Sequence, residues 1–218
     1  MNKTKIEWCT YTWNPITGCL NDCEYCYARK IYARFKKSFY PTIHYERLGQ
    51  PLRVNKPAKI FVCSVSDFWG KDVPQIWREE VYNIIKACPE HTFQILTKQP
   101  QNITVHDYDH CPNNVWIGIS VTEGKYPHHD YQIMADWEDR IKFVSIEPLL
   151  GKVNLDIRKG WPKPDWIIIG GLSPKPIHPH EWIDDILKQA DEHKIPIFIK
   201  RNAYYPKIRQ EFPTEDRK

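Results

Sequence analysis

Three cysteines, Cys19, Cys23 and Cys26, form a C-x-x-x-C-x-x-C array near the start of the chain. Spacers of two and three residues let a short loop bring three thiolates to one compact metal centre at little cost in closure entropy. The loop itself supplies no fourth ligand, so a metal held here keeps a position open for another molecule. The array therefore predicts an iron–sulfur site that serves catalysis.

A structural zinc site is the alternative interpretation of the same cysteines, with Cys9 or His44 as the fourth ligand. Disulfides are disfavoured because the chain has seven cysteines, an odd number, and its first five residues lack the apolar segment of a secretory signal. We therefore expect reduced thiols in a cytoplasmic protein.

Length and composition favour a single soluble domain. The 218 residues are 41% hydrophobic and carry a formal net charge of +4. We expect one domain over residues 1–218, with a core at about 6–200 and an irregular charged tail at 201–218. No apolar run is long enough to span a membrane. The mild positive charge permits a polyanionic partner without requiring one.

Short apolar runs alternate along the chain with helical patterns and loops. A strand is expected within residues 6–15, followed by the cysteine loop, a helix over 23–37 and a long polar connection over 38–58. The later runs expected to form strands are 59–64, 91–98, 114–121, 141–147, 165–171 and 195–200, and helices are expected at about 74–87 and 181–193. Six or seven such units predict an α/β fold with an incomplete parallel (β/α)6-type barrel, and a flat doubly wound sheet is the competing architecture.

Polar residues follow most of the predicted strands. In parallel α/β folds the functional site lies at the carboxyl ends of the strands, so these residues are expected to surround one site. They are Ser64, Ser66, Asp67, Thr97, Lys98, Ser120, Thr122, Glu147, Gly170, Gly171, Lys200 and Arg201.

The cysteine spacing, with the aromatic Tyr25 directly before the third cysteine, resembles the signature of the radical S-adenosylmethionine (SAM) superfamily. The resemblance implies that Cys19, Cys23 and Cys26 hold a 4Fe-4S cluster whose open iron chelates SAM. One electron then cleaves SAM to methionine and a 5′-deoxyadenosyl radical. An external electron donor of the flavodoxin or ferredoxin type is the partner that this chemistry implies.

The strand-end motifs are similar to those of a small phage and bacterial family near the spore photoproduct lyase branch of that superfamily. The similarity covers roughly residues 6 to 200 and implies a radical SAM barrel. Two segments depart from the family pattern, residues 170–174 (Gly-Gly-Leu-Ser-Pro) and residues 200–203 (Lys-Arg-Asn-Ala). The first lacks an acidic residue and the second an aromatic residue, which puts the substrate in doubt.

The resemblance also implies roles for single residues. Lys98 and Ser120 are expected to bind the methionyl carboxylate of SAM, and Ser64 or Ser66 its polar part. Tyr25 is expected at the edge of the adenine. Asp67 is open between a functional role and a helix cap.

Two further residues are candidates for the chemistry itself. Glu147 is expected to orient the ribose or the substrate, or to balance Lys98 as a buried ion pair. Cys63 is a candidate hydrogen-atom donor to a product radical, by resemblance to lyase-type enzymes. A cysteine in a buried strand is also a common small core residue, and both interpretations stay open.

The sequence thus predicts a radical SAM enzyme with lyase, isomerase or base-modifying activity. A nucleobase in DNA or RNA, or its nucleotide, is the expected substrate, because basic residues alternate with aromatic ones at residues 29–40 and 200–209. The alternative is a non-enzymatic, zinc-dependent module that binds nucleic acid. No membrane partner is expected.

Overall fold

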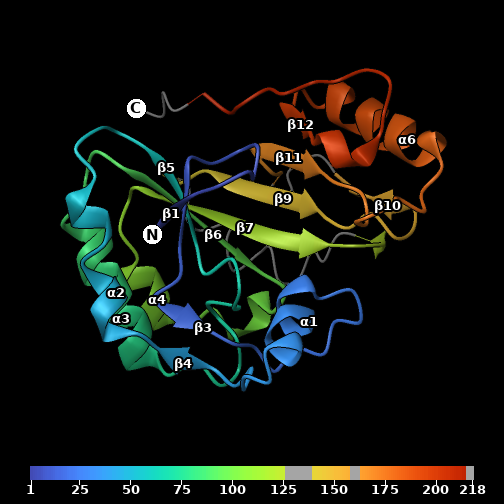
Figure 1. The fold of residues 1–218 in the computed structure, drawn as a ribbon. Coiled ribbons are helices and arrows are strands. Elements are labelled where there is room, and N and C mark those ends of the chain that lie inside the picture. The colour runs from blue at the N-terminus through green and yellow to red at the C-terminus, as the bar shows by residue number, and fades with distance from the viewer. Residues whose placement is uncertain (126–138, 158–162, 215–218) are drawn as a thin grey trace. The chain divides into compact units, whose positions relative to one another are not determined.

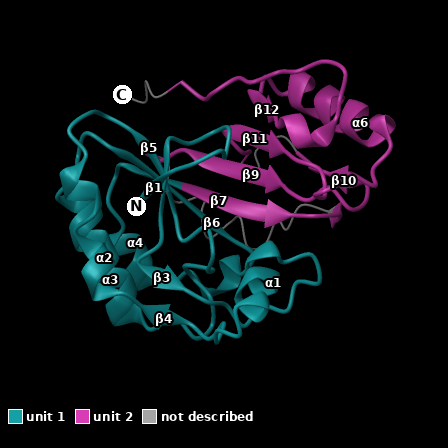
Figure 2. Cartoon of the chain, viewed as in Figure 1, with its two compact units in different colours: residues 1–116 teal, residues 117–218 magenta. Residues whose placement is uncertain are grey.

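The structure, a computed structural model, describes residues 1–125, 139–157 and 163–214 (Figure 1). The chain divides into two compact units, residues 1–116 and 117–218, and each is described by itself (Figure 2). Both combine parallel strands with helices, which confirms the predicted α/β class. Among the described residues, no helix is both long enough and apolar enough to cross a membrane.

Unit 1 is a small, mostly parallel sheet with four α-helices among its described residues. Its strands are β1 (Asn2–Lys3), β2 (Tyr11–Trp13), β3 (Ile16–Thr17), β4 (Thr42–Ile43), β5 (Lys59–Val62) and β6 (Thr92–Thr97). Its helices are α1 (Tyr27–Arg34), α2 (Tyr45–Leu48), α3 (Gln75–Lys86) and α4 (Val105–His110), with short 3-10 turns η1 (Pro51–Arg53) and η2 (Pro100–Asn102). Strands β2, β5 and β6 run parallel, β1 pairs antiparallel with β2, and β3 pairs antiparallel with β4.

Unit 2 is built on four parallel strands. They are β7 (Val115–Val121), which begins just before the unit boundary, β9 (Lys142–Ile146), β11 (Trp166–Ile169) and β12 (Ile197–Ile199). Neighbouring strands pair in the order β7, β9, β11, β12. The short strands β8 (Gly124–Lys125) and β10 (Val153–Asn154) form a separate parallel pair, and the unit also contains α6 (His180–Glu192) and the 3-10 turn η3 (Arg201–Ala203).

The continuous apolar runs of the sequence form buried strands, as predicted. Every residue of β9 and of β11 is buried, as are Ile60, Phe61 and Val62 of β5. Strands covered on both faces need apolar side chains at successive positions, which is why these runs lack the alternation of a half-exposed strand.

Near the N-terminus the elements are shorter than predicted. Within residues 6–15 only Tyr11–Trp13 forms a strand. The helix expected over 23–37 is confined to Tyr27–Arg34, because Cys26 has an extended backbone (φ −61°, ψ 107°) and caps the helix with its thiol. The connection predicted over 38–58 contains β4, α2 and η1, so it is a set of short elements. Of the predicted tail, residues 215–218 lie outside the described part.

A buried ion pair ties α3 to α4 in unit 1. Arg78 donates to the carboxylate of Asp107 at 2.8 and 3.3 Å, and the Tyr82 hydroxyl donates to the same carboxylate at 3.0 Å. Thr104 completes a reciprocal capping box with Asp107 at the start of α4. Burial by itself would raise the pKa of Asp107, but Arg78 and the Thr104 hydrogen bonds outweigh burial and lower the pKa.

This network gives a test of what stabilises unit 1. Asp107→Asn leaves the Arg78 charge buried without its carboxylate, so we expect a loss of about 3–5 kcal/mol of unfolding free energy in urea at pH 7. Because the folded-state pKa of Asp107 is lowered, the carboxylate stabilises the fold above about pH 4, and its contribution falls as the pH drops through the folded pKa. The difference between wild type and variant should therefore shrink in acid.

The matched control is Asp109→Asn on the same helix, where the side chain is exposed. It should change the unfolding free energy by less than about 0.5 kcal/mol. Equal losses for the two substitutions, or a difference that is constant with pH, would contradict the assignment.

Candidate cofactor site

The cysteine loop starts at a glycine that no other residue can replace without movement of the chain. Gly18 has φ +84°, and a Cβ at this position would lie 2.2 Å from the carbonyl oxygen of Tyr40. The Gly18 N–H donates to the carbonyl of Val65 at 3.1 Å, and the Gly18 carbonyl accepts the Ser66 hydroxyl at 2.6 Å. The backbone at the start of the loop thus packs between residues 39–40 and residues 65–66 of unit 1.

Arg29 closes the loop from the helix that follows it. Its Nη2 donates to the carbonyls of Cys19 at 3.0 Å and Asn21 at 3.1 Å. The Cys19 N–H donates to the carbonyl of Phe39 at 2.9 Å, and the Cys26 N–H donates to the carbonyl of Cys23 at 3.0 Å. Because one guanidinium bridges eight to ten residues of chain, the loop and α1 form one structural piece.

The segment after β5 holds the loop from the other side. The Ser64 hydroxyl and the Val65 N–H both donate to Asn14 Oδ1, at 3.2 and 3.3 Å. The Ser66 hydroxyl donates to Gly18, as described above. Both serines predicted to contact SAM therefore donate their hydroxyl hydrogen to another group of the protein. Each hydroxyl oxygen can still accept a hydrogen bond from a ligand.

Asp67 joins the end of β5 to the end of β6. Its carboxylate accepts the Thr97 hydroxyl at 2.6 Å, the Lys98 N–H at 2.9 Å and the Trp69 N–H at 3.2 Å. It does not cap a helix, because α3 begins at Gln75 with Pro74 at the cap. Burial raises the pKa of Asp67 despite these hydrogen bonds. Asp67 thus organises the turn beside the cysteine loop.

Lys98 and Tyr25, both predicted to bind SAM, lie together. The Lys98 ammonium is 5.5 Å from the centroid of the Tyr25 ring, within the range of a cation–π interaction. Tyr25 directly precedes Cys26, so this contact brings the end of β6 to the last cysteine of the loop. A positive charge is therefore present beside the predicted ligands.

The thiols of the loop influence one another. Burial, together with the charges of Asp67, Cys23 and Cys26, raises the pKa of Cys19 to about 11, against a hydrogen bond from the Asn21 N–H that lowers it. Among the described residues, no three His, Cys, Asp or Glu side chains stand in an arrangement that could hold a metal ion. The donor set fits an iron–sulfur cluster chemically, because soft thiols on one short loop are its usual ligands. Their convergence on a cluster is part of the proposal below.

Cys63 follows β5 directly and is buried. Its backbone has φ 58°, and its N–H donates to the carbonyl of Trp13 at 2.8 Å. Burial raises its pKa to about 12, so the side chain is a neutral thiol at pH 7. A neutral thiol is the form that can give up a hydrogen atom, and it is equally the form of an inert core cysteine.

In unit 2, Ser120 and Glu147 lie at the carboxyl ends of neighbouring strands. Ser120 is in register with Ser145, whose buried hydroxyl has no hydrogen-bond partner in the described part of the chain. Within unit 2, Glu147 forms an ion pair with Lys200. A side chain at Gly170 would lie 2.9 Å from the Glu147 carboxyl carbon, so only glycine leaves Glu147 room here.

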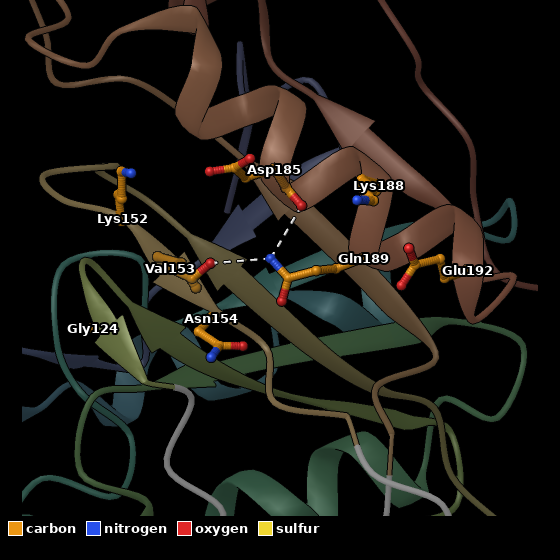
Figure 3. A pocket seen from close by; sticks show the side chains of 8 residues that line it. All are labelled: Gly124, Lys152, Val153, Asn154, Asp185, Lys188, Gln189 and Glu192. Atoms are coloured by element: carbon orange, nitrogen blue, oxygen red, sulfur yellow. Dashed lines mark hydrogen bonds between the residues drawn. The ribbon is translucent and has the colours of Figure 1, made fainter.

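A separate cleft of about 520 Å³ lies among α6, β8 and β10 (Figure 3). Gln189 crosses it and donates to the carbonyls of Val153 at 3.3 Å and Asp185 at 3.1 Å. Lys152, Lys188 and the acidic Asp185 and Glu192 mix both charge signs along its walls. None of the predicted site residues lines it.

Solved structures of spore photoproduct lyase share the fold of this chain. A double mutant with bound AdoMet and dinucleoside spore photoproduct matches with a TM-score of 0.55 and 14% identity, over 97% of this chain and 65% of that one. A cysteine-to-alanine mutant with dinucleoside spore photoproduct gives 0.53 and 14%, over 100% and 66%. A cysteine-to-serine mutant gives 0.53 and 14%, over 91% and 57%. The chain thus spans less than two thirds of the length of these lyases.

This likeness confirms the predicted α/β fold and shows that it is the fold of spore photoproduct lyase. The family model DUF5131, described as a protein of unknown function, matches residues 3–215, and the chain belongs to that family. No curated protein matches the chain.

Three residues that shape the site were not predicted. Asn14 lies within the segment 6–15 expected to hold the first strand, and its amide oxygen holds the turn after β5. Arg29 lies within a run of basic residues that gave no sign of its inward contacts. Ser145 stands two residues before Glu147, so strand alternation could have placed it on the same face.

A glycine pair tests the construction of the loop. Gly18→Ala adds left-handed strain and a clash with the Tyr40 carbonyl, whereas Gly124→Ala adds similar strain (φ +81°) with nothing within 4 Å of the new Cβ. We expect Gly124→Ala to cost about 1–2 kcal/mol in urea unfolding, and Gly18→Ala to cost more and also to lower the iron bound per chain after anaerobic reconstitution. Equal costs and equal iron contents would show that the loop does not need this close approach.

Proposed function

We propose that this protein is a radical SAM enzyme whose Cys19, Cys23 and Cys26 hold a 4Fe-4S cluster. The observation that carries the proposal is the C-x-x-x-C-x-x-C loop itself, fixed by Gly18 and Arg29. The loop follows β2 of the mostly parallel sheet and the short strand β3, and leads into α1, in a fold like that of spore photoproduct lyase. When bound, such a cluster supplies the electron that cleaves SAM to methionine and a 5′-deoxyadenosyl radical.

The residues around the loop are suited to binding SAM. We assign Lys98 to the methionyl carboxylate, because its ammonium lies beside Tyr25 and so beside the last cysteine. Tyr25 offers an aromatic face at the same place for the adenine edge. The hydroxyl oxygens of Ser64 and Ser66, whose protons are used internally, are left to accept from the SAM amino group. Ser120 in unit 2 is assigned to the carboxylate as well.

The two candidate catalytic residues keep distinct roles. Cys63 is assigned as hydrogen-atom donor to a product radical, because a buried neutral thiol ends β5 next to the segment that braces the cysteine loop. Glu147 is assigned to orient the ribose or the substrate, and its ion pair with Lys200 holds the carboxylate in place.

We propose a nucleobase in DNA or RNA, or its nucleotide, as the substrate. Three of the structural neighbours contain a dinucleoside spore photoproduct. Within the basic and aromatic segment 29–40, the exposed Lys37 and Tyr40, which follow α1, provide charge for phosphate and a ring for stacking. In the second basic stretch, Lys200 pairs with Glu147 and Arg209 with Asp191 and Glu211, so two of its four basic residues have acidic partners. A small one-electron donor of flavodoxin or ferredoxin type is the further partner, in the cytoplasm.

Iron content tests the ligand assignment. Anaerobically purified protein should carry about four irons per chain, and Cys19→Ala, Cys23→Ala or Cys26→Ala should each abolish the cluster absorbance. Cys88→Ala is the control and should keep both iron and colour, because Cys88 lies at a turn after α3 and away from the loop. A colourless protein that binds zinc, or a triple-alanine variant that retains its iron, would contradict the proposal and favour the zinc module.

Product analysis tests the substrate class. Reduced enzyme and SAM are incubated separately with genomic DNA, RNA, free nucleotides and a peptide library, and 5′-deoxyadenosine is measured by mass spectrometry. We expect its yield to rise with a nucleic acid or nucleotide and not with peptides, and to vanish in the Cys23→Ala variant. A rise with peptides alone, together with DNA binding that is independent of salt, would contradict the nucleic-acid assignment.

A further inference from the structure

Helix α1, which follows the cysteine loop (Figure 1), presents its apolar residues to solvent. Tyr27, Ile31 and Phe35 recur at four-residue steps and are 57%, 48% and 65% exposed. The only buried residue of α1 is Ala28. An amphipathic helix normally turns such a stripe toward the core, so the exposed stripe indicates an interaction surface.

Contacts on a second side of α1, together with the Tyr27 hydroxyl, which donates to the carbonyl of Ser64 at 2.8 Å, anchor the helix. The Arg29 guanidinium lies 5.2 Å from the centroid of the Phe39 ring, and the Tyr32 and Phe39 rings are 4.9 Å apart. With 3.6 residues per turn, Ala28, Arg29 and Tyr32 share one side of the helix, and the exposed stripe lies on the neighbouring side, turned by about 100° around the helix axis. The exposure of the stripe therefore follows from how the cysteine loop is braced.

Basic residues flank the exposed stripe. The α1 surface is defined here as Tyr27, Lys30, Ile31, Arg34, Phe35 and Lys36, all of which are exposed. Residues 27–40 hold five of the 31 lysines and arginines and none of the 27 acidic residues, so the rest of the chain has 26 basic against 27 acidic residues. The net positive charge of the protein thus comes entirely from this segment.

The α1 surface also adjoins the predicted cluster ligands. The helix starts at Cys26, whose thiol accepts the Arg29 N–H at 3.4 Å, and its eight residues span about 12 Å. Leu20, inside the cysteine loop, is exposed as well. A molecule seated on this surface would lie within one short helix of the cluster, and electron transfer is faster the closer the two redox centres are.

We propose that the α1 surface is the docking site for a small acidic one-electron donor protein. This inference rests on the proposed function, because it requires a cluster at Cys19, Cys23 and Cys26. In the docked complex the donor's flavin or iron centre is oxidised by one electron and the cluster is reduced by the same electron. An apolar centre with a basic rim, on one short helix, suits the small interfaces of weak redox encounters and complements an acidic partner.

A nucleic acid is the alternative ligand for the positively charged α1 surface. Its bases stack on aromatic rings and on arginine, and the aliphatic Ile31 and Leu20 offer no such platform. The apolar centre of the α1 surface is partly aliphatic, as at protein interfaces, and it lies next to the ligand loop. The observations therefore favour a protein donor, and DNA binding becomes an outcome of the test.

The test compares two triple variants with the same change in charge. The first is Lys30→Glu, Arg34→Glu, Lys36→Glu on the α1 surface, and the control is Lys56→Glu, Lys71→Glu, Lys86→Glu, at exposed lysines elsewhere in unit 1. A third variant, Ile31→Ser with Phe35→Ser, removes the apolar centre. Each reconstituted protein is reduced anaerobically by reduced flavodoxin or by dithionite over a range of salt, and the bleaching rate is followed by stopped flow.

We expect the α1 charge variant to be reduced by flavodoxin about tenfold more slowly than the control at low salt, with the difference vanishing at high salt. The apolar variant should be slowed at all salt concentrations. Dithionite should reduce all proteins at the same rate. If dithionite bleaches nothing, the proposed function has failed and the inference with it.

Two results obtained with an intact cluster would overturn the docking site alone. One is equal flavodoxin rates for the α1 charge variant and the control. The other is a flavodoxin rate that stays unchanged in the α1 charge variant while its binding of a fluorescent single-stranded or duplex DNA becomes weaker. That result would assign the α1 surface to nucleic acid.

Discussion

The hydrogen bonds between Gly18 and the segment that follows β5 anchor the cysteine loop of unit 1. The N–H of Gly18 bonds Val65 and its carbonyl bonds the Ser66 hydroxyl, at a point where even a methyl group would collide with the Tyr40 carbonyl. Because Gly18 is buried and takes part through its backbone, the cysteine loop starts from a fixed position, and Arg29 then closes it from α1. A loop of polar residues with three thiols would otherwise have many conformations and lose much entropy on binding a metal.

These contacts change the role that we give to the motif Ser-x-Ser-Asp, residues 64–67. From the sequence, Ser64, Ser66 and Asp67 were candidates for contact with SAM. In the structure the two serine hydroxyls donate hydrogen bonds to other residues of the protein, and the Asp67 carboxylate accepts them. Asp67 ties the turn after β5 to the end of β6 and so places Lys98 and Tyr25 beside the loop. We therefore regard the motif as a brace for the ligand loop, with any contact to SAM made by the remaining hydroxyl oxygens.

The strands were predictable because buried parallel strands need unbroken apolar runs, and β9 and β11 have them. The cysteine loop was predictable from spacing alone. The orientation of α1 was not, because the same apolar periodicity fits a helix that faces the core or one that faces a partner, and only the inward contacts of Arg29 decide between them. The Glu147–Lys200 pair was missed because strand-end residues 53 positions apart carry no local signal of their pairing.

The central claim is that the three cysteines hold a cluster with one iron open to SAM. Electron paramagnetic resonance of the dithionite-reduced, anaerobic protein, recorded with and without SAM, tests it most directly. The account predicts the signal of a reduced 4Fe-4S cluster whose g values change when SAM is added, because the SAM amino and carboxylate groups enter the coordination of the open iron. A cluster signal that SAM leaves unchanged, or a protein that binds zinc and gives no signal at all, would contradict it.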